Sequence, residues 1–147
     1  MAYTALNIAA YVIKEYRQRN KGISNLKLQK VLYYIQIKSL QDLFRAAFDD
    51  EIEAWRHGPV IRKVYYTFHR YLSDNIDYSE QKVNENYVSI DDKLSHIIDY
   101  VIVHTVDFDA WDLVKRTQAT SPWKQCYRKT YCNVIDVTKL YSGDINI

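Results

Sequence analysis

Apolar side chains recur with helical spacing through the N-terminal third of the chain. The first stretch predicts a helix that Thr4 caps and that extends to about Lys21, where Gly22 ends it in a left-handed conformation. Ser24 caps a second predicted helix that continues to about Phe44. This second helix has apolar residues on two sides, so we expect it to lie at the centre of a bundle. The two rows are Leu28, Val31, Leu32 and Ile35, and Tyr33, Ile37, Leu40 and Phe44.

The middle of the chain changes from strand to helix to loop. Charged and apolar residues alternate over residues 51–55, which predicts a short, half-buried strand. Gly58 and Pro59 end that strand, and we expect Pro59 to occupy the first turn of a third helix. The apolar face of this third helix consists of Val60, Ile61, Val64, Tyr65 and Phe68. Residues 73–86 are polar without helical periodicity and predict a loop, and residues 87–90 predict a short strand.

The C-terminal third begins with the most regular apolar pattern in the chain, a helix that opens at residue 91 or 92. Its apolar positions are Leu94, Ile97, Ile98, Val101 and Ile102. Asp109 caps a short helix, and a Ser-Pro pair starts another that spans about 121–131. Residues 133–137 resemble a strand, and the tail after residue 142 is expected to be frayed.

Together these elements predict an α+β, mainly α fold, in which a compact helical bundle carries one small antiparallel sheet of short strands. The chain has 147 residues, 48% of them hydrophobic, so we expect residues 1–147 to form a single domain around one core. A net charge of +2 argues against a dedicated polybasic nucleic-acid binder and against a highly charged disordered chain. Three glycines and two prolines exclude collagen-like chains and glycine-rich phosphate loops.

Nothing in the sequence predicts export or insertion into a membrane. The N-terminus lacks a basic segment followed by an apolar one, and the longest apolar run covers residues 31–35, far short of the roughly 20 that a membrane helix needs. Two cysteines, Cys126 and Cys132, are too few for a disulfide scaffold. We therefore expect a soluble, reduced, cytoplasmic protein without a membrane partner.

Residues suited to catalysis or metal binding are sparse. His96 and His104 share a helix but lie about 12 Å apart along it, too far to bind one metal ion. The sequence contains no Cys-x-x-Cys, His-Glu-x-x-His or Gly-x-x-x-x-Gly-Lys motif. Asp109 and Asp112 are explained as a helix cap and a first-turn carboxylate. We expect no catalytic residue, no metal and no cofactor, and therefore a protein that is not an enzyme.

The third helix mixes basic and aromatic side chains: Arg62, Lys63, Tyr65, Tyr66, His69 and Arg70. Such a mixture can bind phosphates and stack on bases. However, Val64, Tyr65 and Phe68 are needed for the core, which places the charges on the solvated face. A nucleic acid is therefore not the expected partner, although nucleic-acid binding remains an alternative.

Three stretches, in this order along the chain, resemble one known family. Residues 24–36 read Ser-Asn-Leu-Lys-Leu-Gln-Lys-Val-Leu-Tyr-Tyr-Ile-Gln, residues 48–65 contain Glu-Ile-Glu-Ala-Trp-Arg-His-Gly-Pro-Val, and residues 117–123 read Thr-Gln-Ala-Thr-Ser-Pro-Trp. They are similar to the signatures of Panacea-domain proteins, the SocA-like antitoxins that are also described as phage-associated GepA-type proteins. The chain departs from the family at Gln118, where a histidine is usual, and at Val31, which replaces a leucine.

The resemblance implies the antitoxin of a toxin–antitoxin system, which neutralises a cognate toxin by direct protein–protein binding. It also implies an alternative function, that of an adaptor which delivers a toxin or another client to a AAA+ protease. A second alternative function is that of a phage-associated nucleic-acid-binding factor. No helix-turn-helix segment is evident, so operator binding is not implied. Gln118 can form a hydrogen bond but cannot titrate, so a proton-dependent role of the family histidine is not carried over.

Fourteen tyrosines are more than one core of this size can bury with every hydroxyl paired, so we expect some of them at the surface. Tyrosine and tryptophan dominate the energetics of protein interfaces. Arg56 and His57 are expected beside the free N–H groups at the start of the third helix, where they could hold a carboxylate or a backbone oxygen of a partner. The candidate partner-binding residues are Trp55, Arg56, His57, Arg62, Tyr65 and Tyr66. The alternative is a purely structural corner with Trp55 in the core.

A second set of motif residues is expected to be structural: Lys30, Tyr33, Gly58, Pro59, Trp111, Pro122 and Trp123. Lys30 follows a core residue on the central helix, so we expect its stem to be buried and its ammonium to pair with a carboxylate of residues 49–53. Trp111 and Trp123 are expected to pack near one another in the core.

Overall fold

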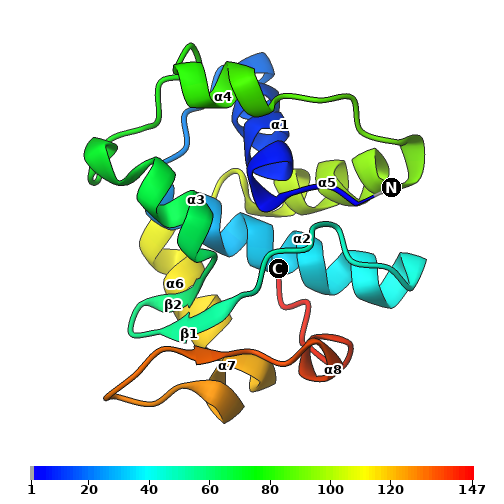
Figure 1. Cartoon of the computed structure of the whole chain (residues 1–147), viewed down its shortest axis with the longest axis vertical. Helices are drawn as coiled ribbons and strands as arrows, with labels where there is room; N and C mark the ends of the chain where they lie inside the picture. Colours follow the sequence, from blue (N-terminus) through cyan, green and yellow to red (C-terminus); the bar gives the residue numbers. More distant parts are fainter. Residues whose placement is uncertain (1) are drawn as a thin grey trace.

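The computed structural model describes residues 2–147, and its helices are arranged around one central helix, drawn in cyan in Figure 1. This helix is α2 (Asn25–Leu43), and the Ser24 side chain caps it by accepting a hydrogen bond from the Lys27 amide. Most α2 positions are buried, including the polar ones Gln29 and Lys30. The central position predicted from its two apolar rows is confirmed.

Helix α1 (Ala5–Gln18) packs against α2 and begins at the predicted cap. The Thr4 side chain accepts from the Asn7 amide, and the Asn7 side chain accepts from the Thr4 amide, which completes a capping box. The prediction that Gly22 supplies the left-handed residue after this helix is wrong. Asn20 does so, with a φ of 55°, because asparagine tolerates this conformation better than most residues.

The sheet contains β1 (Glu53–Trp55), β2 (Gly58–Val60) and β3 (Asn133–Val134), antiparallel and in the order β2-β1-β3. Strand β1 lies within the predicted residues 51–55 and β3 within the strand-like residues 133–137, whereas β2 was not expected. The prediction that Pro59 starts a helix is wrong, because Pro59 lies in β2, an edge strand that tolerates a residue without an N–H. Helix α3 (Arg62–Thr67) begins three residues later.

Two elements replace the loop and strand that were predicted after α3. A short 3-10 helix, η1 (His69–Tyr71), follows α3 directly, and α4 (Gln81–Asn86) forms inside the polar stretch 73–86. Val83 is the buried residue of α4. Because a six-residue helix with one buried apolar residue has no repeating apolar pattern, nothing in the sequence indicated it. Residues 87–90 form no strand.

Helices α5 (Asp92–Thr105) and α6 (Ala110–Gln118) begin at the predicted caps Asp91 and Asp109. In α6 the Asp109 side chain accepts from the Asp112 amide, so the interpretation of these carboxylates as capping groups is confirmed. Both helices contact α2, which also contacts α1, α3 and β2.

In the C-terminal segment, the helix that begins at Ser121 is shorter than predicted, and the tail is more ordered than predicted. Helix α7 (Ser121–Cys126), with Pro122 buried in its first turn, ends before residue 131, and an unpredicted α8 (Val137–Leu140) follows β3. The tail after residue 142 is not frayed. The Gln41 side chain donates to the Gly143 carbonyl at 2.7 Å, and the Tyr34 hydroxyl donates to the Asn146 side chain at 2.6 Å.

The predicted fold class, α+β and mainly α with one small antiparallel sheet, is confirmed. The expectation of surface tyrosines is also confirmed, because the exposed large hydrophobic residues include six of them: Tyr66, Tyr78, Tyr87, Tyr100, Tyr131 and Tyr141. Within residues 2–147, no helix has the length and apolarity required to cross a membrane.

Asp91 joins three parts of this fold. Its side chain caps α5 through the Leu94 amide at 3.1 Å, accepts from Arg45 at 2.6 Å and accepts from the Tyr3 hydroxyl at 3.0 Å. The hydrogen bond from Arg45 is the main reason why the pKa of Asp91 falls from 3.8 to about 2. The ionised carboxylate is therefore the form that the fold stabilises.

We predict that Asp91→Ala lowers the free energy of unfolding at pH 7 by about 1 kcal/mol, the usual effect of losing an N-cap. Because the folded pKa lies below the unfolded one of about 3.9, this stabilisation is complete above pH 4 and disappears as the pH falls through 2. Urea denaturation at pH 7 and at pH 2 measures the difference. Asp92→Ala, one residue further on, is the control, and equal losses in both variants would contradict the assignment.

Candidate protein-binding site

The hairpin β1–β2 and helix α3 bring three predicted partner-binding residues together. The Trp55 ring lies edge-to-face against Tyr65 at 5.0 Å and against Tyr66 at 6.4 Å between centroids, and Tyr65 and Tyr66 are 5.2 Å apart. His69, which was considered only as part of a basic helix, lies 5.3 Å from Tyr65. We call Trp55, Tyr65, Tyr66 and His69 the aromatic cluster.

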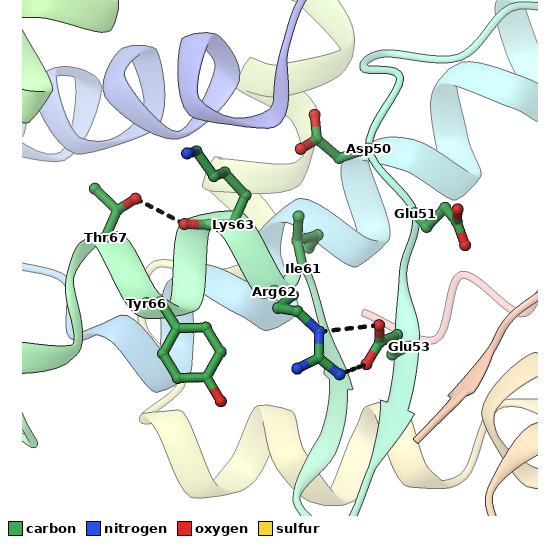
Figure 2. A pocket seen from close by; sticks show the side chains of 8 residues that line it. All are labelled: Asp50, Glu51, Glu53, Ile61, Arg62, Lys63, Tyr66 and Thr67. Atoms are coloured by element: carbon green, nitrogen blue, oxygen red, sulfur yellow. Dashed lines mark hydrogen bonds and ion pairs between the residues drawn. The ribbon is translucent and has the colours of Figure 1, made fainter. Parts of the chain in front are cut away.

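Arg62 pairs with Glu53 (Figure 2), and Glu53 in turn holds the Trp55 ring. Arg62 donates to both oxygens of Glu53, at 2.8 and 3.2 Å, and the Trp55 indole N–H donates to the same carboxylate at 2.8 Å. Partial burial alone would raise the pKa of Glu53, but the hydrogen bonds from Arg62 and Trp55 outweigh it and lower the pKa. The guanidinium also lies 5.5 Å from the centre of the Trp55 ring. Arg62 therefore positions the aromatic cluster rather than standing free.

Two of the hollows beside the aromatic cluster differ in the character of their lining. The one in Figure 2 has a volume of about 580 Å³, and its mixed-charge lining runs from Asp50 and Glu51 to Lys63 and Tyr66. The other, of about 320 Å³, lies between the N-terminal half of α2, the hairpin and η1. We call it the apolar groove, after its lining by Leu26, Trp55, Val60, Tyr65 and Leu72.

The predicted strand-to-helix corner at Arg56 and His57 is a hairpin turn, so the expected helix end beside these residues is wrong. Both side chains are exposed. The Arg56 carbonyl accepts a hydrogen bond from Gln118 at 2.9 Å, which ties the end of α6 to the hairpin turn. The His57 ring lies edge-on to Trp111 at 5.2 Å.

The prediction that Trp111 packs in the core with Trp123 is wrong for Trp111, which is 55% exposed on α6 beside His57. Trp123 is partly buried, stacks on Tyr127 at 4.7 Å and donates to the Trp55 carbonyl at 2.9 Å. The two tryptophans thus support the hairpin from different elements, and Trp111 extends the aromatic surface.

Lys30 anchors the hairpin to the central helix. Its side chain is fully buried, and its Nζ donates to the Pro59 carbonyl at 3.0 Å, so the predicted pairing with a carboxylate of residues 49–53 is wrong. Gly58 has a φ of 104°, and a Cβ there would approach Lys30 Cε to 2.9 Å and Thr117 Oγ1 to 2.8 Å. Glycine is therefore required both for the turn and for the lysine beneath it.

Tyr33 takes the structural role expected of it on the other side of α2. It is fully buried, its hydroxyl lies 2.6 Å from that of Thr120, and its ring meets Tyr34 edge-to-face.

Sequence reasoning missed Leu72, an exposed leucine with positive φ at the rim of the apolar groove. No sequence signal marks it, since this conformation favours glycine. Among residues 2–147, no group of three or more His, Cys, Asp or Glu side chains is arranged to hold a metal ion.

A family model described as "Antitoxin SocA-like, Panacea domain" matches residues 28–124. The chain belongs to this family. The matched part of the Panacea domain begins within α2, ends in α7 and contains the aromatic cluster, Lys30 and Gly58. Neither the curated proteins nor the solved structures gave a match.

Burial lowers the pKa of Lys30 from 10.5 to about 7, because the charged form loses its hydration. Between pH 7 and 10.5 the folded Panacea domain therefore binds fewer protons at Lys30 than the unfolded chain, and the free energy of unfolding should rise with pH. We predict that Lys30→Met removes this rise, which is at most about 1.4 kcal/mol per pH unit. Urea denaturation at pH 6, 7.5 and 9 measures it. Lys63→Met, at an exposed position of α3, is the control and should follow the wild type; parallel curves for Lys30→Met and the wild type would refute the prediction.

Proposed function

We propose that this Panacea-domain protein is the antitoxin of a toxin–antitoxin system and that it neutralises its cognate toxin by binding it directly through the aromatic cluster. The observation that carries this proposal is the assembly of Trp55, Tyr65 and Tyr66 at one surface, with Tyr66 57% exposed. Aromatic side chains of this kind supply large contact area with few rotatable bonds, so they lose little entropy on binding.

Preorganisation supports a binding role for this surface. Trp55 is held by Glu53 and by Trp123, and the strand that carries it is held to α2 through Lys30 and Pro59. A partner therefore need not order the hairpin before it gains contacts. Trp111 and His57 continue the exposed aromatic surface from the cluster onto α6.

Ion pairing argues for a protein partner over a nucleic acid. Of the three basic residues of the α3 region, Arg62 is paired with Glu53 and Arg70 with Glu80. Within the described residues 2–147, Lys63 makes no ion pair, which leaves one free cation on this helix. Nucleic-acid binding draws its affinity from several unpaired cations at once.

The toxin-binding proposal predicts that Tyr66→Ala abolishes neutralisation. The reading frame next to the gene is expressed alone and together with this protein, and growth and co-purification are measured. We expect growth arrest that the wild type relieves, and an affinity of Tyr66→Ala lowered by about ten-fold or more. Tyr100→Ala, which removes an exposed tyrosine from α5, is the matched control and should bind as the wild type does.

Other outcomes would select the alternatives. Failure of the neighbouring product to co-purify with the protein would refute direct neutralisation. Shortened toxin half-life that requires a AAA+ protease would identify an adaptor. Retention of DNA or RNA that falls steeply with salt, and that is lost when Arg62, Lys63 and Arg70 are reversed in charge, would identify a nucleic-acid-binding factor.

A further inference from the structure

Leu72 combines two unfavourable features at one position. Its backbone has φ 53° and ψ −121°, a region that is nearly exclusive to glycine, and its apolar side chain is 72% exposed. Core packing does not explain a leucine there, because most of the side chain contacts no other part of the fold.

The surroundings of Leu72 hold this backbone in place. The Leu72 amide donates to the His69 carbonyl at 3.0 Å, and the Asp74 amide donates to the Tyr71 carbonyl at 2.9 Å. Two residues further on, Ile76 is buried and its amide donates to the Ile23 carbonyl at 2.9 Å. The turn is thus fixed from both sides, and it presents the Leu72 side chain at the rim of the apolar groove. A strained residue that packing does not require points to a role in binding.

The polar groups on the floor of the apolar groove are already paired within the protein. The Gln29 side chain accepts from the Ile61 amide and donates to Asn25, whose side chain donates to the Tyr65 carbonyl. Lys30 donates to the Pro59 carbonyl. A ligand would therefore meet apolar walls there, and few free donors or acceptors.

The charged residues of the groove have one sign. Arg56 is the exposed cation at its edge, Lys30 is buried and donates to the Pro59 carbonyl, and of the described residues that line it none is acidic. Within residues 2–147, Arg56 makes no ion pair. The groove thus offers an apolar hollow beside unpaired positive charge, the complement of an apolar side chain next to a carboxylate.

We propose that the apolar groove receives a large apolar side chain of the toxin that stands next to an Asp or Glu, and that Leu72 forms one wall of this contact. The inference rests on the proposed function and names the chemistry of its partner. A volume of about 320 Å³ is at the lower end for ligand pockets, which suits one anchoring side chain.

Two observations favour a protein segment over a small molecule or a nucleobase. Leu72, Tyr66 and Trp111 are each more than half exposed, and they extend the apolar surface beyond a hollow that a small ligand would fill. A nucleobase is recognised through its hydrogen-bonding edge, and the floor groups that could read it are paired.

Leu72→Gly tests the contact without damaging the fold. Glycine adopts this backbone without strain, so the urea midpoint of the variant should equal or exceed that of the wild type. Phe44→Gly is a matched control: Phe44 also has positive φ (59°) and is 80% exposed, but it ends α2 about 27 Å along the axis from Leu26. Both variants remove an exposed apolar side chain, and only Leu72→Gly removes it from the groove.

A displayed library of random heptapeptides, selected on the wild-type protein, supplies the probe. We expect enriched peptides to share a large apolar residue beside Asp or Glu. Their affinity should fall about ten-fold or more for Leu72→Gly and for Arg56→Glu, and less than about two-fold for Phe44→Gly. Peptides without the carboxylate, equal binding to Leu72→Gly, or no enrichment would overturn the proposal.

The same variants are then assayed against the neighbouring gene product. Toxin binding that survives in Leu72→Gly but is lost in Tyr66→Ala would leave the antitoxin function intact and refute the groove. Groove peptides that bind as expected while the neighbouring product does not bind would refute the antitoxin assignment and leave the groove standing. The two proposals therefore fail by different results.

Discussion

The hydrogen bond from the buried Lys30 to the Pro59 carbonyl is the contact on which the binding surface depends. A lysine inside an apolar core is costly unless its nitrogen has a partner, and here that partner belongs to the hairpin. The lysine stem occupies the space in which Gly58 lacks a Cβ, so helix and hairpin approach more closely than any other residue would allow. Position 58 and position 30 therefore constrain one another.

This contact also determines the positions of the residues at the surface. The hairpin carries Glu53 and Trp55 at defined positions, Glu53 binds Arg62 at the start of α3, and α3 presents Tyr65 and Tyr66 beside Trp55. Each step joins a more buried group to a more exposed one. The family motifs in α2 and in the hairpin are thus two halves of one structural unit, and the aromatic cluster is its exposed end.

Much of the fold was predictable because its signals are local. Ser24, Asp91 and Asp109 cap helices where the sequence placed them, and the two apolar rows of α2 identified the central helix. Pro59 misled the interpretation, because proline suits both a helix start and an edge strand, and only the pairing with β1 decides between them. Trp55, Tyr65 and Tyr66 were named from the sequence as candidate binding residues. The place of His69 beside them and the partner of Lys30 were not predicted, because both depend on tertiary contacts.

Leu72 shows a further limit of prediction from the sequence, and the limit has a physical reason. A sequence pattern reports what favours folding, and this residue opposes folding both in its backbone and in its exposure. Phe44 has the same two features at the other end of α2, so exposure and positive φ alone do not define a site. What distinguishes Leu72 is its place at a hollow whose buried polar groups are already hydrogen-bonded and whose edge carries Arg56, unpaired within residues 2–147. Strain indicates function here only because the surrounding geometry supplies something for a partner to bind.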